Sequence, residues 1–265
     1  MDKKVIIITG ASSGIGYELA KHLSSDGHHV IGASRTFPKE AIDFDYKICD
    51  VSSEASMVEL YKSIARDHKH IDVLINCAGY GIGGAIEDTS YHIAMKLHQI
   101  NVLGPFLLTQ LFLPMLKKSK QGRIVNIGSV AGEITIPFQA FYTMSKASLQ
   151  KFTEALRMEL KPFNVQVTNI LPGDTNTNFG TNRQFQMEEN SLYKDRVTRS
   201  LNKMTQDENH GMKPYSVVKV VRKQLKKRRM KPFVTVGFKY KGAMLLSRLL
   251  PAKLKERIIY TLYGK

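Results

Sequence analysis

Short runs rich in β-branched and other apolar residues alternate along the chain with longer segments in which apolar residues recur every three or four positions. The short runs predict buried β-strands at 5–9, 30–33, 46–49, 73–75, 123–127, 165–170 and 233–236. The longer segments predict helices at 14–25, around 58–65, near 101–118 and at 141–160. Strands that are apolar on both faces are typical of a parallel sheet covered by helices on both sides. The pattern therefore predicts an α/β fold with right-handed crossovers.

A polar segment interrupts this alternation after the strand at 165–170. A loop as long as 174–213 inside a compact domain is usually a lid or a binding segment. We therefore expect a lid over a binding site at 174–213, with a short helix at roughly 183–203.

The C-terminal part resumes the alternation. A basic helix after Pro214 and the strand at 233–236 are expected to complete the sheet. The last segment, 238–265, is basic and predicts two short amphipathic helices separated by Pro251. No linker rich in Gly, Pro or Ser divides the chain, so we predict that residues 1–265 form a single domain with a C-terminal extension at 238–265.

No segment predicts secretion or a membrane span. The apolar run at 5–8 is too short for the core of a signal peptide. The run at 100–116 is longer, but polar residues and prolines interrupt it, so we expect a buried or interfacial helix there. The two cysteines, Cys49 and Cys77, offer no disulfide framework and favour a reducing compartment. A cytoplasmic location is expected.

The positive charge is concentrated in the last quarter of the chain. The formal net charge is +16, and residues 1–193 hold 19 Lys/Arg and 19 Asp/Glu, whereas residues 194–265 hold 20 and 4. Three interpretations are open for the basic end: docking at an anionic membrane surface, attraction of phosphate-bearing or acyl-carrier-bound substrates, or a helical cap with a solvated basic face. No nucleic-acid-binding motif accompanies the charge, so we expect no nucleic-acid partner.

A glycine-rich turn follows the first predicted strand and opens the first predicted helix. Its sequence is Thr9-Gly10-Ala11-Ser12-Ser13-Gly14-Ile15-Gly16. Glycines let the backbone approach a pyrophosphate, and the helix N-terminus offers free N–H groups and the positive end of its dipole. In this context the motif predicts a dinucleotide site formed by Gly10, Ser12, Ser13, Gly14, Ile15 and Gly16. An ordinary glycine-rich turn is the alternative.

The end of the second predicted strand indicates which dinucleotide is bound. A site specific for NAD places an acidic residue there to accept the ribose hydroxyls, but this chain has Ser34 followed by Arg35. The guanidinium of Arg35 can pair with a 2′-phosphate and stack on adenine. We therefore expect NADP(H) to be preferred over NAD(H); a solvated arginine is the alternative.

Tyr142 and Lys146 are four residues apart in a helical pattern and therefore share a face. A free phenol has a pKa of about 10, too high for efficient acid–base catalysis, and a nearby ammonium lowers it. Ser129 follows the strand at 123–127, and its hydroxyl would polarise a carbonyl. The set predicts carbonyl reduction with Tyr142 as the proton donor. A surface pair on an amphipathic helix is the alternative for Tyr142 and Lys146 alone.

These motifs, in this order, resemble the short-chain dehydrogenase/reductase family over roughly residues 3–180. The resemblance also rests on Asp50-Val51, Asn76-Cys77-Ala78-Gly79, Asn101, Pro172-Gly173 and Thr177. It implies a Rossmann-type, doubly wound, mostly seven-stranded parallel sheet with helices on both faces. It also implies an oxidoreductase that acts on CH–OH groups with NAD(P). No metal site is expected.

The resemblance further implies roles for individual residues. Asn101 would hold a water that connects the lysine to solvent, completing a catalytic set with Ser129, Tyr142 and Lys146. Lys146 would also bind the nicotinamide ribose. The cofactor contacts expected in addition to the glycine motif and Arg35 are Asp50 and Val51 at adenine, Asn76, Ala78, Gly79, Tyr142, Pro172, Gly173 and Thr175, and Thr177 near the carboxamide. Cys77 is a small departure from the family pattern, and we expect it to stay out of the chemistry.

The substrate side is expected to be apolar. Segments 80–86, 130–141 and 174–213 should line the pocket, and their apolar residues favour a mostly apolar carbonyl or alcohol. The expected contacts are Ser129, Tyr142, Ile136 and Phe138; packing of the two apolar residues under loops is the alternative. These stretches resemble the branch of the family that holds 17β-hydroxysteroid and retinol dehydrogenases.

Two functions of different classes therefore remain open. The first is an NADP(H)-dependent oxidoreductase for an apolar substrate. The second is a non-catalytic dinucleotide-binding sensor or scaffold, a class that typically loses the active Tyr or Lys, both of which this chain retains. The family usually pairs through the helices near 101–118 and 141–160, which implies a homodimer or homotetramer.

Overall fold

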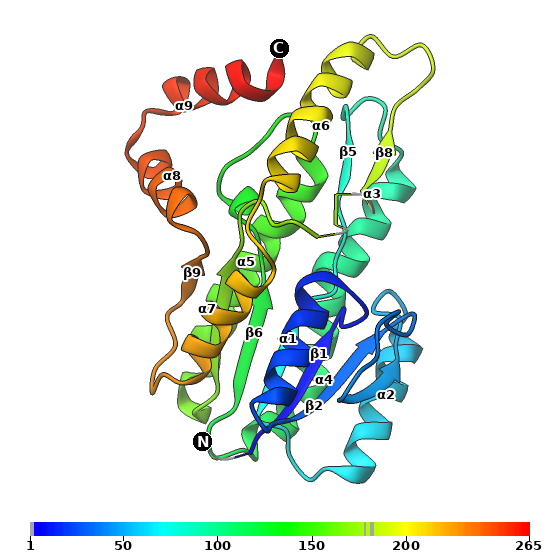
Figure 1. The fold of residues 1–265 in the computed structure, drawn as a ribbon, viewed down its shortest axis with the longest axis vertical. Helices are drawn as coiled ribbons and strands as arrows, with labels where there is room; N and C mark the ends of the chain where they lie inside the picture. The colour runs from blue at the N-terminus through cyan, green and yellow to red at the C-terminus, as the bar shows by residue number, and fades with distance from the viewer. Residues whose placement is uncertain (1–2, 178, 181–182) are drawn as a thin grey trace.

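The computed structural model describes residues 3–177, 179–180 and 183–265. A seven-stranded sheet in the order β3-β2-β1-β4-β6-β7-β9 forms the centre, and every neighbouring pair is parallel (Figure 1). Its strands are β1 (Val5–Thr9), β2 (His29–Ser34), β3 (Asp45–Ile48), β4 (Val73–Asn76), β6 (Arg123–Ile127), β7 (Gln166–Leu171) and β9 (Phe233–Thr235). The predicted Rossmann-type architecture is confirmed.

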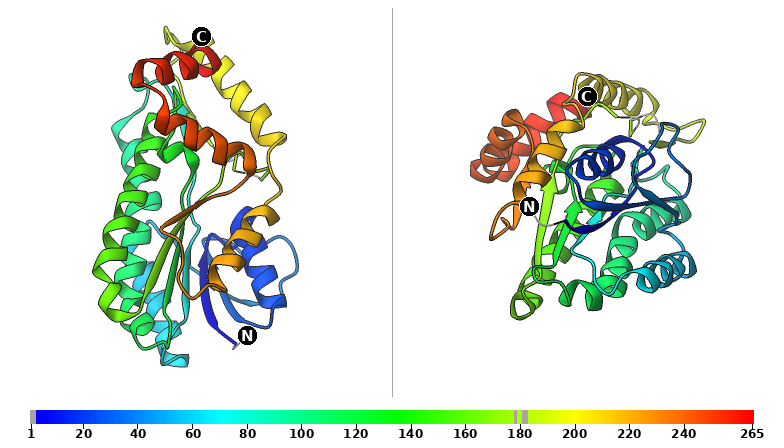
Figure 2. Two further views of the ribbon diagram at one scale, coloured as in Figure 1. Left: turned by 90° about the vertical axis from the view of Figure 1, so that its left-hand side faces the viewer. Right: turned by 60° about the horizontal axis from the view of Figure 1, so that its bottom comes forward.

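Helices cover both faces of this sheet because its strands are apolar on both sides. Ile7 of β1 packs into a cluster with α2 (Glu54–Asp67), α4 (Gly104–Lys117) and α5 (Ala140–Glu159). Its neighbours Ile6 and Ile8 point to the opposite face and pack against α1 (Gly14–Ser25) and α7 (Tyr215–Leu225). The two helical layers are visible on either side of the sheet in the turned views (Figure 2).

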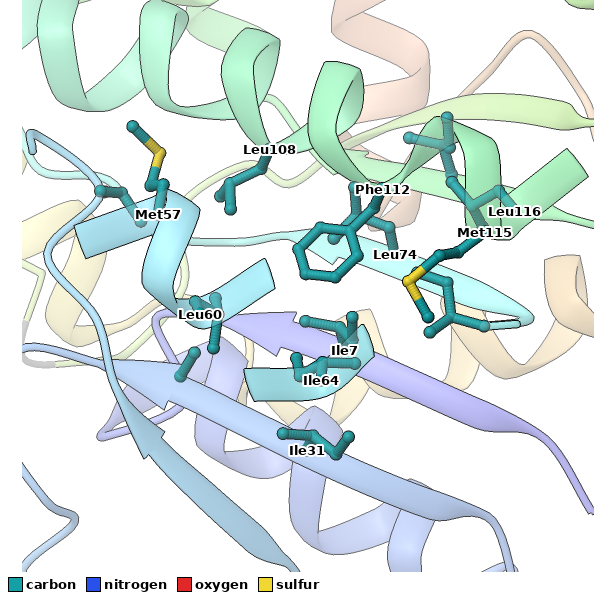
Figure 3. Close-up of a cluster of buried hydrophobic side chains, with 14 of the residues drawn as sticks. Ile7, Ile31, Met57, Leu60, Ile64, Leu74, Leu108, Phe112, Met115 and Leu116 are labelled. Carbon is teal, nitrogen blue, oxygen red and sulfur yellow. The ribbon is translucent and has the colours of Figure 1, made fainter. Parts of the chain in front are cut away.

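The larger core cluster centres on Phe112 of α4, which is fully buried (Figure 3). Its ring meets the ring of Tyr61 from α2 edge-on, with centroids 5.5 Å apart. Residues from β1, β2 and β4 form the floor of the same cluster. This packing fixes α4 against the sheet.

The helix near 101–118 begins ten residues earlier than the sequence pattern suggests. It consists of α3 (Tyr91–His98), a π-helical turn (Gln99–Leu103) and α4. The whole run, Tyr91–Lys117, is long and apolar enough to cross a membrane by length and composition, but half of its most apolar window is buried inside the fold. Its buried side chains belong to the core clusters, as expected for a buried helix.

The segment after β7 contains more structure than a loop. β8 (Gln184–Gln186) pairs in parallel with β5 (Ile82–Gly84), and α6 (Lys194–Asn209) follows. The predicted helix at 183–203 is therefore wrong in its bounds, because residues 184–186 form a strand that pairs with residues 82–84 and the helix begins at Lys194. This pairing lays the segment over the loop that follows β4 (Figure 1).

The chain ends in two short helices, α8 (Phe238–Leu249) and α9 (Ala252–Ile259), separated at Pro251 as predicted. A π-helical turn (Tyr260–Gly264) follows α9, and two short 3-10 helices occur earlier, at Val130–Gly132 and Lys161–Phe163. Figure 1 shows α8 and α9 along the edge of the molecule next to β9 and α6.

Candidate active site

The glycine-rich turn joins β1 to α1 at the carboxyl edge of the sheet. Gly10 has a left-handed backbone with φ of 70°, and a Cβ there would lie 2.8 Å from the backbone of Ala78. A Cβ on Gly16 would overlap the carbonyl oxygen of Gly10. No side chain caps the N-terminus of α1, which leaves its first N–H groups to an anion. The residues present fit the pyrophosphate of a dinucleotide.

The other predicted residues of this motif lie around the same turn. Ser13 occupies the N-cap position of α1 in an extended conformation, and Ile15 packs against the core beneath it. The backbone N–H of Ser12 donates to the hydroxyl of Ser34 over 3.2 Å. This contact ties the glycine turn to the end of β2, where the ribose of a dinucleotide would lie.

The segment after β7 closes on the glycine turn from the other side. A Cβ built on Gly14 would lie 3.5 Å from the side chain of Thr177. The hydroxyl of Thr175 donates to the carbonyl oxygen of Gly173 over 2.9 Å, and Pro172 is buried. The structure therefore brings Pro172, Gly173, Thr175 and Thr177 to the expected edge of the sheet.

Arg35 follows β2 and is exposed. Its positive charge lies close enough to Asp50 to lower the pKa of that carboxyl group. Burial raises the pKa of Asp50, but hydrogen bonds from Ser52 and the charges of Arg35 and Lys96 outweigh burial and lower the pKa overall. Asp50 accepts hydrogen bonds from the N–H and the hydroxyl of Ser52, at 2.9 and 2.7 Å. A carboxylate and a guanidinium thus share the region predicted for adenine and its ribose.

Three more of the predicted cofactor residues have clear structural contacts. The side chain of Val51 is buried against α4. The amide of Asn76 donates to Asn126 over 2.8 Å and joins β4 to β6. The backbone N–H of Ala78 donates to the hydroxyl of Thr9 over 3.2 Å. These contacts brace the loop after β4 against the first strand.

Tyr142 and Lys146 are both buried on α5, one helical turn apart. The ammonium of Lys146 lies 5.8 Å from the centre of the Tyr142 ring and donates to the carbonyl oxygen of Ile127 over 3.0 Å. A Cβ built on Gly79 would lie 3.7 Å from this ammonium and 3.1 Å from Oδ1 of Asn101. The lysine, Gly79 and Asn101 therefore meet at one point behind the tyrosine.

Asn101 reaches this point because a π-helical turn, Gln99–Leu103, carries it inward. Such turns are frequent at functional sites. The side chain of Asn101 accepts from the N–H of Tyr80 over 3.1 Å and donates to its carbonyl oxygen over 2.9 Å. It also donates to the hydroxyl of Ser145 over 3.1 Å, which in turn donates to the backbone of Tyr142 over 2.7 Å.

Ser129 stands opposite the phenol. Its Oγ accepts from the N–H of Ala131 over 3.1 Å. Burial raises the pKa of Tyr142 to about 12, and the hydrogen bond with Ser129 and the charge of Arg183 lower it by less than burial raises it. Of the residues predicted for catalysis, the structure therefore brings Ser129, Tyr142, Lys146 and Asn101 together.

The predicted influence of the lysine on the tyrosine needs correction. Burial lowers the pKa of Lys146 to about 8, and the charges acting on the Tyr142 phenol come from Arg183, Glu208 and Asp174. The reason is geometric, because the ammonium is turned toward the backbone at the end of β6. Cys77 lies nearby, and burial raises the pKa of its thiol to about 12, so the thiol stays neutral.

The sequence pattern did not reveal a buried ion pair on the substrate side. The guanidinium of Arg183, with a side chain only 2% exposed, pairs with the carboxylate of Glu208 on α6. Within the described residues, Nε and Nη1 of Arg183 and Oε2 of Glu208 have no hydrogen-bond partner. The ring of Phe179 also lies against that of Tyr142, with centroids 5.6 Å apart. No local motif marks these residues, because they meet only through tertiary folding.

The predicted substrate contacts divide into two groups. Ile136 and Phe138 are partly buried under α6, in a cluster with Leu201. Phe138 has a φ of 62°, and its carbonyl oxygen accepts from the backbone of Gly84 over 2.9 Å. Ile82 of β5 lies in the apolar cluster around Tyr142.

Comparisons with known proteins agree with this geometry. A family model described as short chain dehydrogenase matches residues 4–188. The chain is 37% identical to a 3-ketodihydrosphingosine reductase of Bacteroides thetaiotaomicron over 217 residues, 81% of this chain and 80% of the relative. It is 39% identical to a probable short-chain type dehydrogenase/reductase of Helicobacter pylori over 178 residues, 65% of each protein.

Solved structures show the same fold over nearly the whole chain. A short-chain dehydrogenase from Streptomyces avermitilis superposes with a TM-score of 0.83 at 26% identity, covering 99% of this chain and 96% of that one. The similarity therefore includes the C-terminal part, beyond the residues that the family model matches.

Proposed function

The chain belongs to the short-chain dehydrogenase family of oxidoreductases, and from this membership we propose that it reduces the carbonyl of a mostly apolar substrate with NADPH. The observation that carries the proposal is the meeting of Ser129, Tyr142 and Lys146 beside the glycine turn. The reverse oxidation of the matching alcohol uses the same residues.

The chain's own residues supply a proton donor and a polarising group. Bound NADPH would supply the hydride. Ser129 donates a hydrogen bond to the carbonyl oxygen and stabilises the charge that develops there. The phenol of Tyr142, whose pKa burial raises to about 12, is protonated at neutral pH and can donate its proton; the hydrogen bond with Ser129 and the charge of Arg183 lower that pKa, the direction that favours proton transfer.

Lys146 and Asn101 complete the proton path in this proposal. With a pKa of about 8, Lys146 is mostly protonated at neutral pH but releases a proton readily. Asn101 lies beside the same point at Gly79 and holds the backbone of Tyr80 in place. A water held there would link the ammonium to solvent.

An apolar substrate with a polar group near its carbonyl fits the surroundings of Tyr142. Ile82, Phe179 and other apolar side chains gather around the phenol, while the Arg183–Glu208 pair is close enough to act on its pKa. The Bacteroides relative is named for 3-ketodihydrosphingosine, a long-chain amino ketone. We therefore propose long-chain ketones that carry a polar end group as the substrate class.

The proposal includes four further points. Arg35 selects NADP(H) over NAD(H), because it is exposed at the ribose end without a carboxylate on β2. Residues 174–213 act as the substrate lid within a single dinucleotide-binding domain, 1–265. The protein forms a homodimer or homotetramer through α4 and α5. It is cytoplasmic.

A substrate panel tests this proposal. NADPH oxidation is measured with medium- and long-chain ketones, long-chain amino ketones, steroids and retinoids, and with NADH in parallel. We expect Tyr142→Phe to lower kcat/KM by roughly 10²–10⁴-fold, while Tyr91→Phe, at a side chain 80% exposed on α3, leaves it unchanged. Full activity of Tyr142→Phe would overturn the mechanism.

A further inference from the structure

The C-terminal helix α8 exposes a row of large apolar side chains. Phe238, Leu245 and Leu249 are 91%, 62% and 73% exposed. Their spacing of seven and four residues places them on one side of the helix. Met244 is the buried residue of α8, and it lies on the other side. The helix therefore presents its apolar face to solvent, the reverse of a helix that packs on a core.

α9 and the turn after it repeat this arrangement. Leu254, Ile258 and Leu262 recur every four residues and are 44%, 41% and 56% exposed. No residue of α9 itself is buried. The two helices lie on the same side of the molecule, which faces the viewer in the left-hand view of Figure 2. We call the exposed apolar residues of α8, α9 and Leu262 the terminal face.

Basic side chains accompany the terminal face. Residues 238–265 hold seven Lys/Arg and one Asp/Glu. By helical position, Lys241 and Arg248 lie beside the apolar row of α8. In the described part of the chain, the ion pairs within 4.0 Å involve none of these seven cations. Arg248 has a cation–π contact with the ring of Phe233, 5.0 Å from its centre. An exposed apolar row next to cations that have no salt bridge is the pattern of a helix that lies in a lipid interface.

We propose that the terminal face docks on the surface of an anionic lipid bilayer, with the apolar rows in the acyl boundary and the cations at the headgroups. Charge selects this occupant over a second copy of the chain, because pairing two terminal faces would bring together two segments that each hold seven Lys/Arg and one Asp/Glu. The reason for such docking, delivery of a long-chain substrate, rests on the proposed function; the docking itself does not.

Hydrogen bonds join the C-terminal segment that carries the terminal face to two segments near the active site, the residues after β7 and α6. The hydroxyl of Tyr240 on α8 donates to Asp174 over 2.5 Å, and its ring covers Gly173. The hydroxyl of Tyr263 donates to Asp207 on α6 over 3.0 Å. Docking therefore places α6 and the residues after β7 next to the lipid surface, where a long-chain ketone is dissolved.

Vesicle sedimentation tests the docking without cofactor or substrate. The full chain is mixed with vesicles of phosphatidylcholine alone or of phosphatidylcholine with phosphatidylglycerol, at low and high salt. We expect binding only to the mixed vesicles and loss of that binding as salt is added. One cation near such a surface is worth about a fivefold change in affinity, so Lys241→Gln/Arg248→Gln should weaken binding roughly 30-fold.

Two further variants separate the terminal face from charge in general. Leu245→Ser/Leu249→Ser keeps every charge but should also weaken binding at least about tenfold, because it removes inserted apolar area. The matched control is Lys226→Gln/Lys227→Gln, which removes two cations of the turn between α7 and β9, at the other end of the molecule (Figure 1). It should keep its affinity within about threefold.

The proposal is overturned if the wild-type chain ignores the mixed vesicles at low salt, or if the control loses as much binding as the α8 variants. Sedimentation velocity supplies a third outcome: if the leucine variants dissociate into smaller species, the terminal face joins copies of the chain instead of binding lipid. Because no turnover is measured, docking can stand when the panel of ketones fails, and can fail when it succeeds.

Discussion

The ammonium of Lys146 lies 3.0 Å from the carbonyl oxygen of Ile127 but 5.8 Å from the centre of the Tyr142 ring. Burial acts on the two side chains in opposite directions, because it disfavours the charged form of each. The pKa of Tyr142 rises to about 12 and that of Lys146 falls to about 8. At neutral pH the buried phenol therefore holds its proton more tightly than a free tyrosine, whereas the ammonium releases its proton more readily than a free lysine.

The lowered pKa of Lys146 predicts a specific pH dependence of stability. Between about pH 8 and the unfolded value of about 10.4, the unfolded chain binds one more proton at this lysine than the folded chain. The free energy of unfolding contributed by Lys146 therefore rises with pH in this range, by up to about 1.4 kcal/mol per pH unit.

Urea unfolding at pH 8 and pH 9 measures this contribution. We expect the wild-type chain to gain more stability over that interval than Lys146→Met, which has no titrating group there. In both proteins the raised pKa of Cys77 makes its contribution fall with pH above about 9, and this fall is steeper in Lys146→Met, which lacks the charge that lowers the pKa of Cys77. Equal slopes for the two proteins would show that the lysine is not held at a lowered pKa.

The exposed guanidinium of Arg35 leads to a prediction on cofactor choice. A hydrogen-bonded ion pair with a 2′-phosphate is worth about 1.5–3 kcal/mol, so Arg35→Ala should raise the KM for NADPH roughly 10- to 100-fold. The KM for NADH should stay within about twofold, because NADH has no phosphate there.

Steady-state kinetics with both cofactors check this, with Lys39→Ala as the control. Lys39 is also exposed and lies four residues further along the chain, so its loss changes the net charge equally. An equal rise in KM for NADPH and NADH in Arg35→Ala would assign Arg35 a structural role instead.

The sequence predicted the parts of the fold that local patterns control. The strand Arg123–Ile127 and the helix Gly14–Ser25 match their predicted bounds residue for residue, because both are bounded by turn residues and are apolar in the right period. The set of Ser129, Tyr142 and Lys146 could likewise be predicted, since strand order brings the carboxyl ends of β4, β6 and β7 together.

Features that depend on contacts between residues far apart in the sequence could not be predicted. β8 is polar and short, and it is a strand only because Ile82–Gly84 offers it a partner. The direction of the Lys146 side chain depends on the backbone carbonyl of Ile127 at the end of β6, and the pKa of Tyr142 depends on its burial. Arg183 and Glu208 are ordinary charged residues in the sequence and become a buried pair only when α6 packs down.

Asn101 gives a third prediction, because its amide holds both backbone groups of Tyr80. Asn101→Ala removes these bonds and leaves the buried groups unpaired, at a cost of about 1–3 kcal/mol each. We expect a lower melting temperature and a loss in kcat of at least about tenfold, with little change in KM.

Asn101→Asp provides the conservative comparison. The carboxylate still accepts from the N–H of Tyr80 but cannot donate to its carbonyl oxygen or to Ser145. Its kcat and melting temperature should fall between those of the wild type and Asn101→Ala. If Asn101→Ala melts like the wild type yet keeps its activity, Asn101 neither positions the loop nor supports the proton path.

The Arg183–Glu208 pair provides the last prediction, because it joins β8 and the residues before it to α6 in a buried environment. Removing one partner leaves an uncompensated buried charge, so Arg183→Met and Glu208→Met should each destabilise this region by about 3–5 kcal/mol. Replacing both with methionine removes both charges and should restore most of that loss.

Hydrogen exchange of the amides in α6 and β8 reports the local stability, and amides of α2, on the far side of the sheet, serve as the internal control. Strictly additive losses in the double variant would show that the two charges do not stabilise each other, and the lid would then be held by the packing of Val197, Leu201 and Met204 alone.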